Sequence, residues 1–269
     1  MSYQITPLLL KAEQSDFAYM IKTIKSYVNF SSDTELRGLF DNWVENPVDA
    51  KKALLAEAVE REIRYAGSAD VAFVFRKIFG SGEVAGADIH EIIADVSDKL
   101  KVKLKRLSSA EAKLEHLVKS LASRQFFSLS AEEQEELLSK CGFEKEERQE
   151  FFRRVKENKH LLFPLLLRFL GPEIVTALVE ALLIRILAAF IGKEAAKEIL
   201  MALAKKYPLW AEWLGPIVWT MTIAWVGYDL QGAAYRKTIP CLLRLGIVAL
   251  RDGPQEGESF WNASVDVTP

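Results

Sequence analysis

The sequence has few of the residues on which disulfide, metal and nucleic-acid-binding proteins depend. Its two cysteines, Cys141 and Cys241, lie far apart and form no Cys-x-x-Cys pair, so we expect two buried free thiols. The formal net charge is -2, which argues against a nucleic-acid partner, because such proteins usually carry a basic surplus. The chain starts without a basic segment followed by an apolar run, which predicts a cytoplasmic protein.

Motifs for catalysis and cofactor binding are also missing. The segment that starts at His90, HEIIAD, departs from the zinc-protease pattern H-E-x-x-H at its last position. Glu157 and His160 have the spacing of a di-iron ligand pair, but the second pair that such a site needs is absent. The glycine-rich segment 80–86 follows a helical pattern, where a dinucleotide-binding loop would follow a strand. We therefore expect no enzymatic activity, no cofactor and no metal.

Strand signals are sparse, and most of the chain has helical patterns. Helix starts are indicated by Ser-x-x-Glu capping boxes at 108–111 and 130–133, and by Asp88 at the same spacing before Glu91. The alternating segment 101–105, KVKLK, fits the continued end of a helix as well as a strand. These patterns predict an all-α fold, a multi-helix bundle with a charged helical N-terminal part and an apolar C-terminal helical layer or hairpin.

Helix ends are predicted at glycines that suit the left-handed position after a last turn: Gly67, Gly142 and Gly192. Pro172 follows Gly171 and suits the first turn of a helix.

Charge divides the chain near residue 160. Residues 91–160 hold 29 Asp, Glu, Lys and Arg residues, whereas residues 161–230 hold 12. We therefore predict a charged helical region over 1–160, an apolar helical region over 161–251 and an extended or flexible tail over 252–269.

Two apolar segments raise the question of a membrane span. Residues 213–228 carry no formal charge, but this run is shorter than the roughly 20 residues that a bilayer core requires. The earlier segment, 161–192, contains four charged residues: Arg168, Glu173, Glu180 and Arg185. Each costs about 2.5–3.5 kcal/mol at a bilayer centre. Neither segment is therefore predicted to be a permanent span.

Three interpretations of the apolar third stay open. It forms the core of a globular protein, or it is a helical hairpin stored inside the soluble protein and exposed at a membrane, or it is a surface that holds a partner helix or client. The amphipathic linker 192–208 between the two apolar segments favours the hairpin. So do tryptophans suited to a membrane interface: Trp210, Trp213, Trp219 and Trp225.

Three stretches resemble a known bacterial family. They are GADIHEIIADVSDKLKVKLK at 86–105, LGPIVWTMTIAWVGYDLQG at 214–232 and GAAYRKTIPCLLRLGIVALR at 232–251. Together they resemble the YaaW-like proteins, which are often labelled as related to ubiquinol–cytochrome c chaperones. The resemblance covers roughly residues 5–250 and implies an all-helical, client-binding fold that assists assembly of a membrane respiratory complex. The three tryptophans between 213 and 225 depart from the more glycine-rich segment expected in the family.

The Tyr235-Arg236 motif precedes Pro240, which breaks helical hydrogen bonding and favours an extended residue before it. We therefore expect Tyr235 and Arg236 at the end of one helix or in a link before the next. Arg236 is expected to need an acidic or carbonyl partner, with Asp229 the nearest candidate. It either anchors a helix corner or contacts an anionic lipid or a partner.

A basic patch follows the 86–100 segment. Its members are Lys101, Lys103, Lys105 and Arg106. It is either a solvated helix end or a surface for anionic headgroups or phosphate.

The sequence as a whole predicts a non-enzymatic cytoplasmic protein, peripheral or conditional at a membrane, that interacts with membrane lipid or an apolar protein client. The alternative is a pore-forming effector that inserts its own apolar hairpin. The candidate interaction residues are Trp213, Trp219, Trp225, Tyr235, Arg236, Lys101, Lys103, Lys105 and Arg106.

Overall fold

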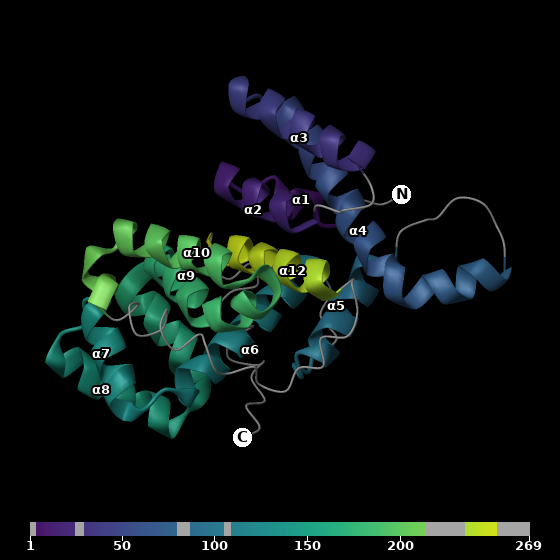
Figure 1. The fold of residues 1–269 in the computed structure, drawn as a ribbon. Coiled ribbons are helices and arrows are strands. Elements are labelled where there is room, and N and C mark those ends of the chain that lie inside the picture. The colour runs from purple at the N-terminus through teal and green to yellow at the C-terminus, as the bar shows by residue number, and fades with distance from the viewer. Residues whose placement is uncertain (1–3, 25–29, 80–86, 105–108, 213–234, 252–269) are drawn as a thin grey trace. The chain divides into compact units, whose positions relative to one another are not determined.

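The computed structural model describes residues 4–24, 30–79, 87–104, 109–212 and 235–251, with the side chains of 30–33, 69–79 and 185 left aside. Every regular element in these ranges is a helix, so the predicted all-α class is confirmed (Figure 1). The chain forms two compact units. The first comprises residues 1–101, 107–114 and 228–248, and the second comprises 102–106, 115–227 and 249–269.

The first unit is organised around one long helix. α4, Asp49–Phe79, packs against α1, Thr6–Leu9, α2, Gln14–Ile24, α3, Phe30–Glu45, and α5, Ile89–Lys99. α3 and α4 form a hairpin joined at residues 46–48 (Figure 1). The C-terminal helix α12, Tyr235–Leu250, also belongs to this unit up to residue 248. Residues 238–250 of α12 are all buried, including the polar Thr238 and the charged Arg244.

The second unit is a succession of helices that mostly pack on their neighbours in the chain. α6, Ala110–Ser128, enters it at residue 115 and is followed by the remaining helices: α7, Ala131–Lys140; α8, Lys145–Glu157; η1, Lys159–Leu161; α9, Leu162–Ile191; α10, Lys193–Lys206; and η2, Pro208–Trp210. Phe151 of α8 lies at the centre of an aromatic cluster, with its ring 6.3 Å from Phe126 and 5.5 Å from Phe143. The predicted composition boundary near residue 160 falls inside this unit, between α8 and α9. The predicted tail, 252–269, lies outside the described residues.

Two of the three predicted helix starts are confirmed, and the third is shifted by one residue. Ser130 and Glu133 form a complete capping box, and the Asp88 side chain accepts a hydrogen bond from the His90 N–H. The cap of α6 is Ser109, whose hydroxyl accepts from the Ala112 N–H at 3.0 Å. Ser108 lies outside the described residues, and the cap at Ser109 is no Ser-x-x-Glu box, because the residue three positions after it is Ala112.

The glycines behave as predicted at two helix ends and differently at a third. Gly142 and Gly192 have positive φ values of 99° and 84°, as a left-handed end requires. Gly171, at φ 75° and ψ 167°, breaks α9 into two helices, and Pro172 starts the second. Gly67, however, does not end a helix, because α4 continues through it to Phe79. A Cβ at Gly67 would lie 2.5 Å from Cδ1 of Ile92, so this glycine permits close packing of α4 and α5.

Two further local predictions were wrong. The helix before the basic patch ends at Lys99, and Lys101 has a left-handed backbone with φ 55°, so residues 101–104 do not continue that helix. Pro240 does not break a helix, because α12 begins at Tyr235 and runs through it. Pro240 has no N–H to donate to the carbonyl of Arg236, four residues earlier in the first turn of α12.

Candidate functional site

Five of the predicted interaction residues lie outside the described part of the chain: Trp213, Trp219, Trp225, Lys105 and Arg106. The fourth tryptophan of the proposed interface group, Trp210, is described. It is buried, and its indole N–H donates to the Lys140 carbonyl at 3.1 Å. Trp210 therefore packs inside the second unit, and its place at a membrane interface stays a prediction for the membrane-exposed hairpin alone.

Tyr235 and Arg236 occupy the first turn of α12 in the first unit. The ammonium of Lys99, at the end of α5, lies 5.1 Å from the centroid of the Tyr235 ring. Arg236 is exposed, and its expected acidic or carbonyl partner stays a prediction. Its predicted partner, Asp229, lies outside the described residues. The structure thus brings the Tyr235 motif next to the end of α5, which the sequence alone did not connect.

Lys101 and Lys103 both have exposed side chains. Lys103 also has a structural role through its backbone, because its carbonyl oxygen lies 3.1 Å from Nε2 of the buried His116. A carbonyl accepts only, so this contact assigns the ring proton of His116 to Nε2. The role of the two lysine side chains as interaction residues stays a prediction.

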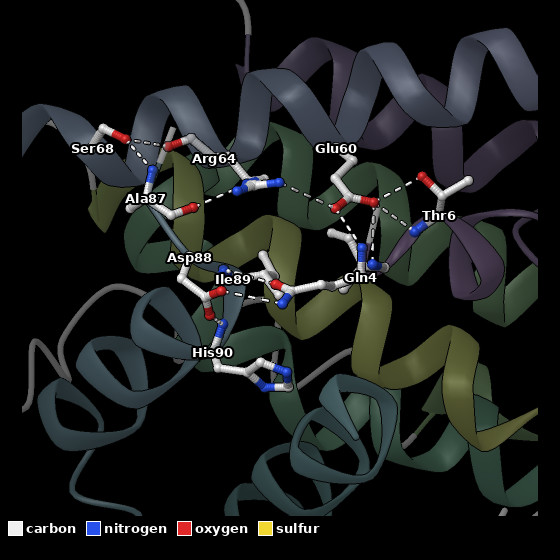
Figure 2. Close-up of polar contacts among 10 residues, drawn as sticks. Gln4, Thr6, Glu60, Arg64, Ser68, Ala87, Asp88, Ile89 and His90 are labelled. Atoms are coloured by element: carbon white, nitrogen blue, oxygen red, sulfur yellow. Dashed lines mark hydrogen bonds and ion pairs between the residues drawn. The ribbon is translucent and has the colours of Figure 1, made fainter. Parts of the chain in front are cut away.

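A polar row on α4 organises the centre of the first unit. Glu60, Arg64 and Ser68 are spaced four residues apart and therefore lie on one face of the helix (Figure 2). The fully buried Glu60 carboxylate accepts from four donors: the N–H groups of Gln4, Ile5 and Thr6 and the Thr6 hydroxyl, at 2.8, 3.1, 2.7 and 2.8 Å. The donors of the first turn of α1, which a helix cannot satisfy itself, are thus bonded by a side chain from another helix.

The same row fixes the entry to α5. The Arg64 Nε donates to the Ala87 carbonyl at 3.0 Å, and the Ala87 N–H donates to the Ser68 hydroxyl at 2.5 Å (Figure 2). Asp88 then accepts from the Gln4 amide at 3.1 Å and from the His90 N–H at 2.7 Å. Burial alone raises the pKa of Asp88, but these hydrogen bonds outweigh it, so the pKa lies below its ordinary value.

Lys113 of α6 contacts the same cluster through His90. The Lys113 ammonium lies 3.0 Å from Nδ1 of His90, which must accept from it, so the ring proton of neutral His90 lies on Nε2. The other members of the cluster are engaged in hydrogen bonds that hold the chain together. Among the described residues no group of three metal-binding side chains gathers there or elsewhere.

A second buried polar contact joins α2 to α12. The Arg244 Nε donates to Oδ1 of the fully buried Asp16 at 2.6 Å. Oδ2 of Asp16 accepts the Glu13 N–H at 2.7 Å, and the Arg244 guanidinium lies 5.4 Å from the centroid of the Tyr19 ring. The arginine is thus held by charge, hydrogen bonding and stacking together.

α6 carries two buried charged residues at i,i+4 spacing, Glu115 and Lys119. Burial lowers the pKa of Lys119 to about 7, although the neighbouring Glu115 carboxylate works in the opposite direction. Perturbed lysines are characteristic of functional sites as well as of structural ion pairs. Lys119 is 1 % exposed, which favours the structural role over that of a nucleophile open to a substrate.

The two cysteines are free and buried, as predicted. Burial raises the pKa of the Cys141 thiol to about 12 and that of Cys241 further. Neither thiol has the lowered pKa that a reactive cysteine requires.

α9 of the second unit is the most apolar of the long described helices, and α10 packs against it. The segment Lys159–Ile184 is the one described helix long and apolar enough to cross a membrane, and half of its most apolar window is buried. α10 packs on α9 through Ala196, Leu200 and Leu203. The predicted amphipathic linker is therefore a helix whose apolar face is already covered. The second apolar segment of the predicted hairpin, 213–228, lies outside the described residues.

Sequence patterns did not identify Glu60, Asp16 or Lys119. The four-residue spacing of Glu60, Arg64 and Ser68 was a detectable signal of a polar helix face, but the partners of these residues come from distant segments. Asp16 and Arg244 lie 228 residues apart, and no spacing rule connects them.

No family model, no curated protein and no solved structure matches the chain. The YaaW-like resemblance therefore stays a prediction, carried by the motifs quoted for it.

Proposed function

We propose that this chain is a non-enzymatic helical protein that interacts with membranes or with apolar membrane-protein clients, in the manner of a chaperone or assembly factor. The observation that carries the proposal is α9, an apolar segment of bilayer length that is half buried by its own chain. The exposed residues of the described part of α9 are Arg168, Pro172 and Glu173, and those of its apolar side chains that lie outside the core are half-buried. These half-buried side chains are the apolar surface that a lipid or a client helix can cover.

The partly exposed apolar side chains of α9 gather near its break. Three half-buried apolar side chains lie within four residues of Gly171: Leu167 and Leu170 before it and Ile174 after it. The charged side chains there, Arg168 and Glu173, are exposed. An apolar group bordered by exposed charges suits contact with a bilayer surface or a partner better than full insertion.

The proposal is tested by vesicle flotation of the purified protein without detergent. Wild-type protein is expected to float with lipid vesicles, and Leu167→Asp/Ile174→Asp to remain at the bottom of the gradient. Leu54→Asp, a change at an exposed apolar residue of α4 in the other unit, is the matched control and floats like the wild type. Wild-type protein that neither floats nor binds an apolar helical peptide in solution overturns the proposal.

A pore-forming effector is the second candidate, because the same apolar segment of bilayer length could insert. α10 covers one face of α9 and is joined to it at Gly192, so α9 must leave α10 before it can insert. At the far end of this pair the Lys206 ammonium lies 3.0 Å from the Glu173 carboxylate, and both side chains are exposed. Cysteines at these two positions are therefore within reach of a short bismaleimide.

Crosslinked Glu173→Cys/Lys206→Cys protein separates the two candidates in a dye-release assay. A pore-former loses release when crosslinked and regains it when a cleavable linker is cut. A protein that holds clients or docks on the surface floats equally well in both states and releases no dye. Glu173→Cys alone, treated in the same way, controls for modification of a single thiol.

A further inference from the structure

The outer face of α10 carries a regular row of residues. Lys193, Lys197, Met201 and Lys205 follow one another at four-residue intervals, so they form a continuous strip along the helix. The inner face, with Ala196, Leu200 and Leu203, is buried. Met201 therefore points away from the core, among lysines.

Met201 and Leu209 are the most exposed large apolar side chains of the described residues, at 71 % and 69 %. Leu209 belongs to the 3₁₀ helix η2, which packs on the end of α10. Single exposed apolar residues are ordinary, but these two stand at the same end of one helix and beside its terminal lysines.

Two of the lysines on this part of the structure form ion pairs with glutamates, and two others form none with a described residue. Lys197 is paired with Glu194 at 3.1 Å, and Lys206 with Glu173 at 3.0 Å. Lys193 and Lys205 form no ion pair with any described residue. They flank Met201 on both sides along the strip.

From these observations we propose that the outer face of α10, together with η2, is a docking surface for an anionic lipid bilayer. Met201 and Leu209 enter the headgroup region, and Lys193 and Lys205 contact lipid phosphates. Lysines beside exposed apolar side chains on a helix packed against the protein match an interfacial helix that lies on the membrane. The inference rests on the proposed membrane interaction, adds to the apolar side chains near Gly171 a second contact surface on α10 and η2, and specifies which lipid that surface prefers.

The test compares binding to vesicles of phosphatidylcholine alone and of phosphatidylcholine with phosphatidylglycerol. Wild-type protein is expected to prefer the anionic vesicles and to lose this preference in high salt. Lys193→Gln/Lys205→Gln is expected to weaken binding to anionic vesicles by about 30-fold, since each lysine near such a surface contributes about fivefold to the affinity. Met201→Ser/Leu209→Ser is expected to weaken binding to both vesicle types by at least ~10-fold.

Matched controls come from exposed residues elsewhere. Leu54→Ser, at a side chain 56 % exposed, controls for loss of apolar surface, and Lys145→Gln/Lys156→Gln on α8 controls for loss of charge. All variants change exposed side chains, and circular dichroism confirms that each is folded. If the wild type binds neither vesicle type, both the proposed membrane interaction and this inference fail. If the wild type binds but the α10 variants bind equally well, only the docking surface is overturned.

Discussion

Arg244 of α12 donates from Nε to the Asp16 carboxylate of α2 at 2.6 Å, across 228 residues of sequence. Both side chains are buried, so their charges compensate one another where water does not. This contact connects an N-terminal helix to the C-terminal helix of the same unit.

We expect Arg244→Met to lower the free energy of unfolding by about 3–5 kcal/mol, because it leaves the buried Asp16 charge without its partner. Asp16→Asn/Arg244→Met should be less destabilised than Arg244→Met alone, since Asn still accepts the Glu13 N–H and carries no charge. Urea unfolding measures both. Arg236→Ala, at an exposed arginine of the same helix, should change stability by less than about 0.5 kcal/mol. Equal losses in the single and double variants would contradict the pairing.

Glu60→Gln should destabilise the first unit by about 2–4 kcal/mol. A glutamine presents one acceptor oxygen and an amide that donates, so it leaves buried N–H groups of residues 4–6 without an acceptor. Thr6→Val removes a single donor and should cost about 1 kcal/mol. Glu57→Gln, one turn earlier on α4 and only half-buried, is the control, and denaturant unfolding of the three variants is the measurement. A loss in Glu60→Gln no larger than in Glu57→Gln would refute the anchoring role.

Gly67→Ala should cost about 1–3 kcal/mol, because the added Cβ meets Cδ1 and Cγ1 of Ile92 at 2.5 and 2.7 Å. In an Ile92→Ala background those atoms are gone, and the same substitution should cost less or nothing. Gly38→Ala in α3 has open space around its Cβ and should stabilise the protein by about 0.5–1 kcal/mol. Thermal unfolding of the wild type, the two single variants, the double variant and the Gly38→Ala control shows whether steric contact or helix propensity causes the effect of Gly67→Ala. A stabilising Gly67→Ala would show that α4 and α5 do not pack this closely.

Stability should rise with pH above neutrality because of Lys119. Burial lowers its pKa to about 7 from an ordinary 10.5, so between these values the unfolded chain holds a proton that the folded chain lacks. The resulting increase in stability is at most about 1.4 kcal/mol per pH unit, and below pH 7 the cost of the buried charge is fully present. Lys119→Met should remove this component of the slope in urea unfolding from pH 7 to pH 10. Lys145→Met, at an exposed lysine of α8, should keep the wild-type slope, and identical slopes in all three proteins would contradict the buried position of Lys119.

The sequence predicted those features that depend on neighbouring residues. Ser130 and Asp88 start helices and Gly142 and Gly192 end them, because caps and left-handed turns depend on local backbone chemistry. It failed at Gly67, whose small size serves a contact with Ile92 of another helix. A glycine after a helical run can either end the helix or allow another helix to pack closely against it. Only the three-dimensional packing distinguishes the two.

The residues of the candidate site also fall into those that local sequence patterns predicted and those that depend on contacts with distant segments. The exposure of Lys101 and Lys103 was one of the alternatives left open by the sequence. The burial of Trp210 was also among them, as part of a globular core, but its hydrogen bond to the Lys140 carbonyl of α7 joins residues 70 positions apart and no local pattern indicates it. Arg236 was expected to have an acidic or carbonyl partner, and the candidate for it, Asp229, lies outside the described residues. Its position in the first turn of α12 turns it outward, whereas Arg244, two turns later, is the arginine that meets a buried carboxylate.

The break at Gly171 has a consequence for how α9 opens. At φ 75° and ψ 167° the glycine interrupts the hydrogen-bond ladder, and Pro172 contributes no amide proton to restore it. Residues 162–170 and 172–191 therefore hold separate ladders, and neither protects the amides of the other. Native-state hydrogen exchange across α9 should accordingly give two protection levels with a step at Gly171, and the two segments open as independent cooperative units along what is one continuous apolar stretch of sequence.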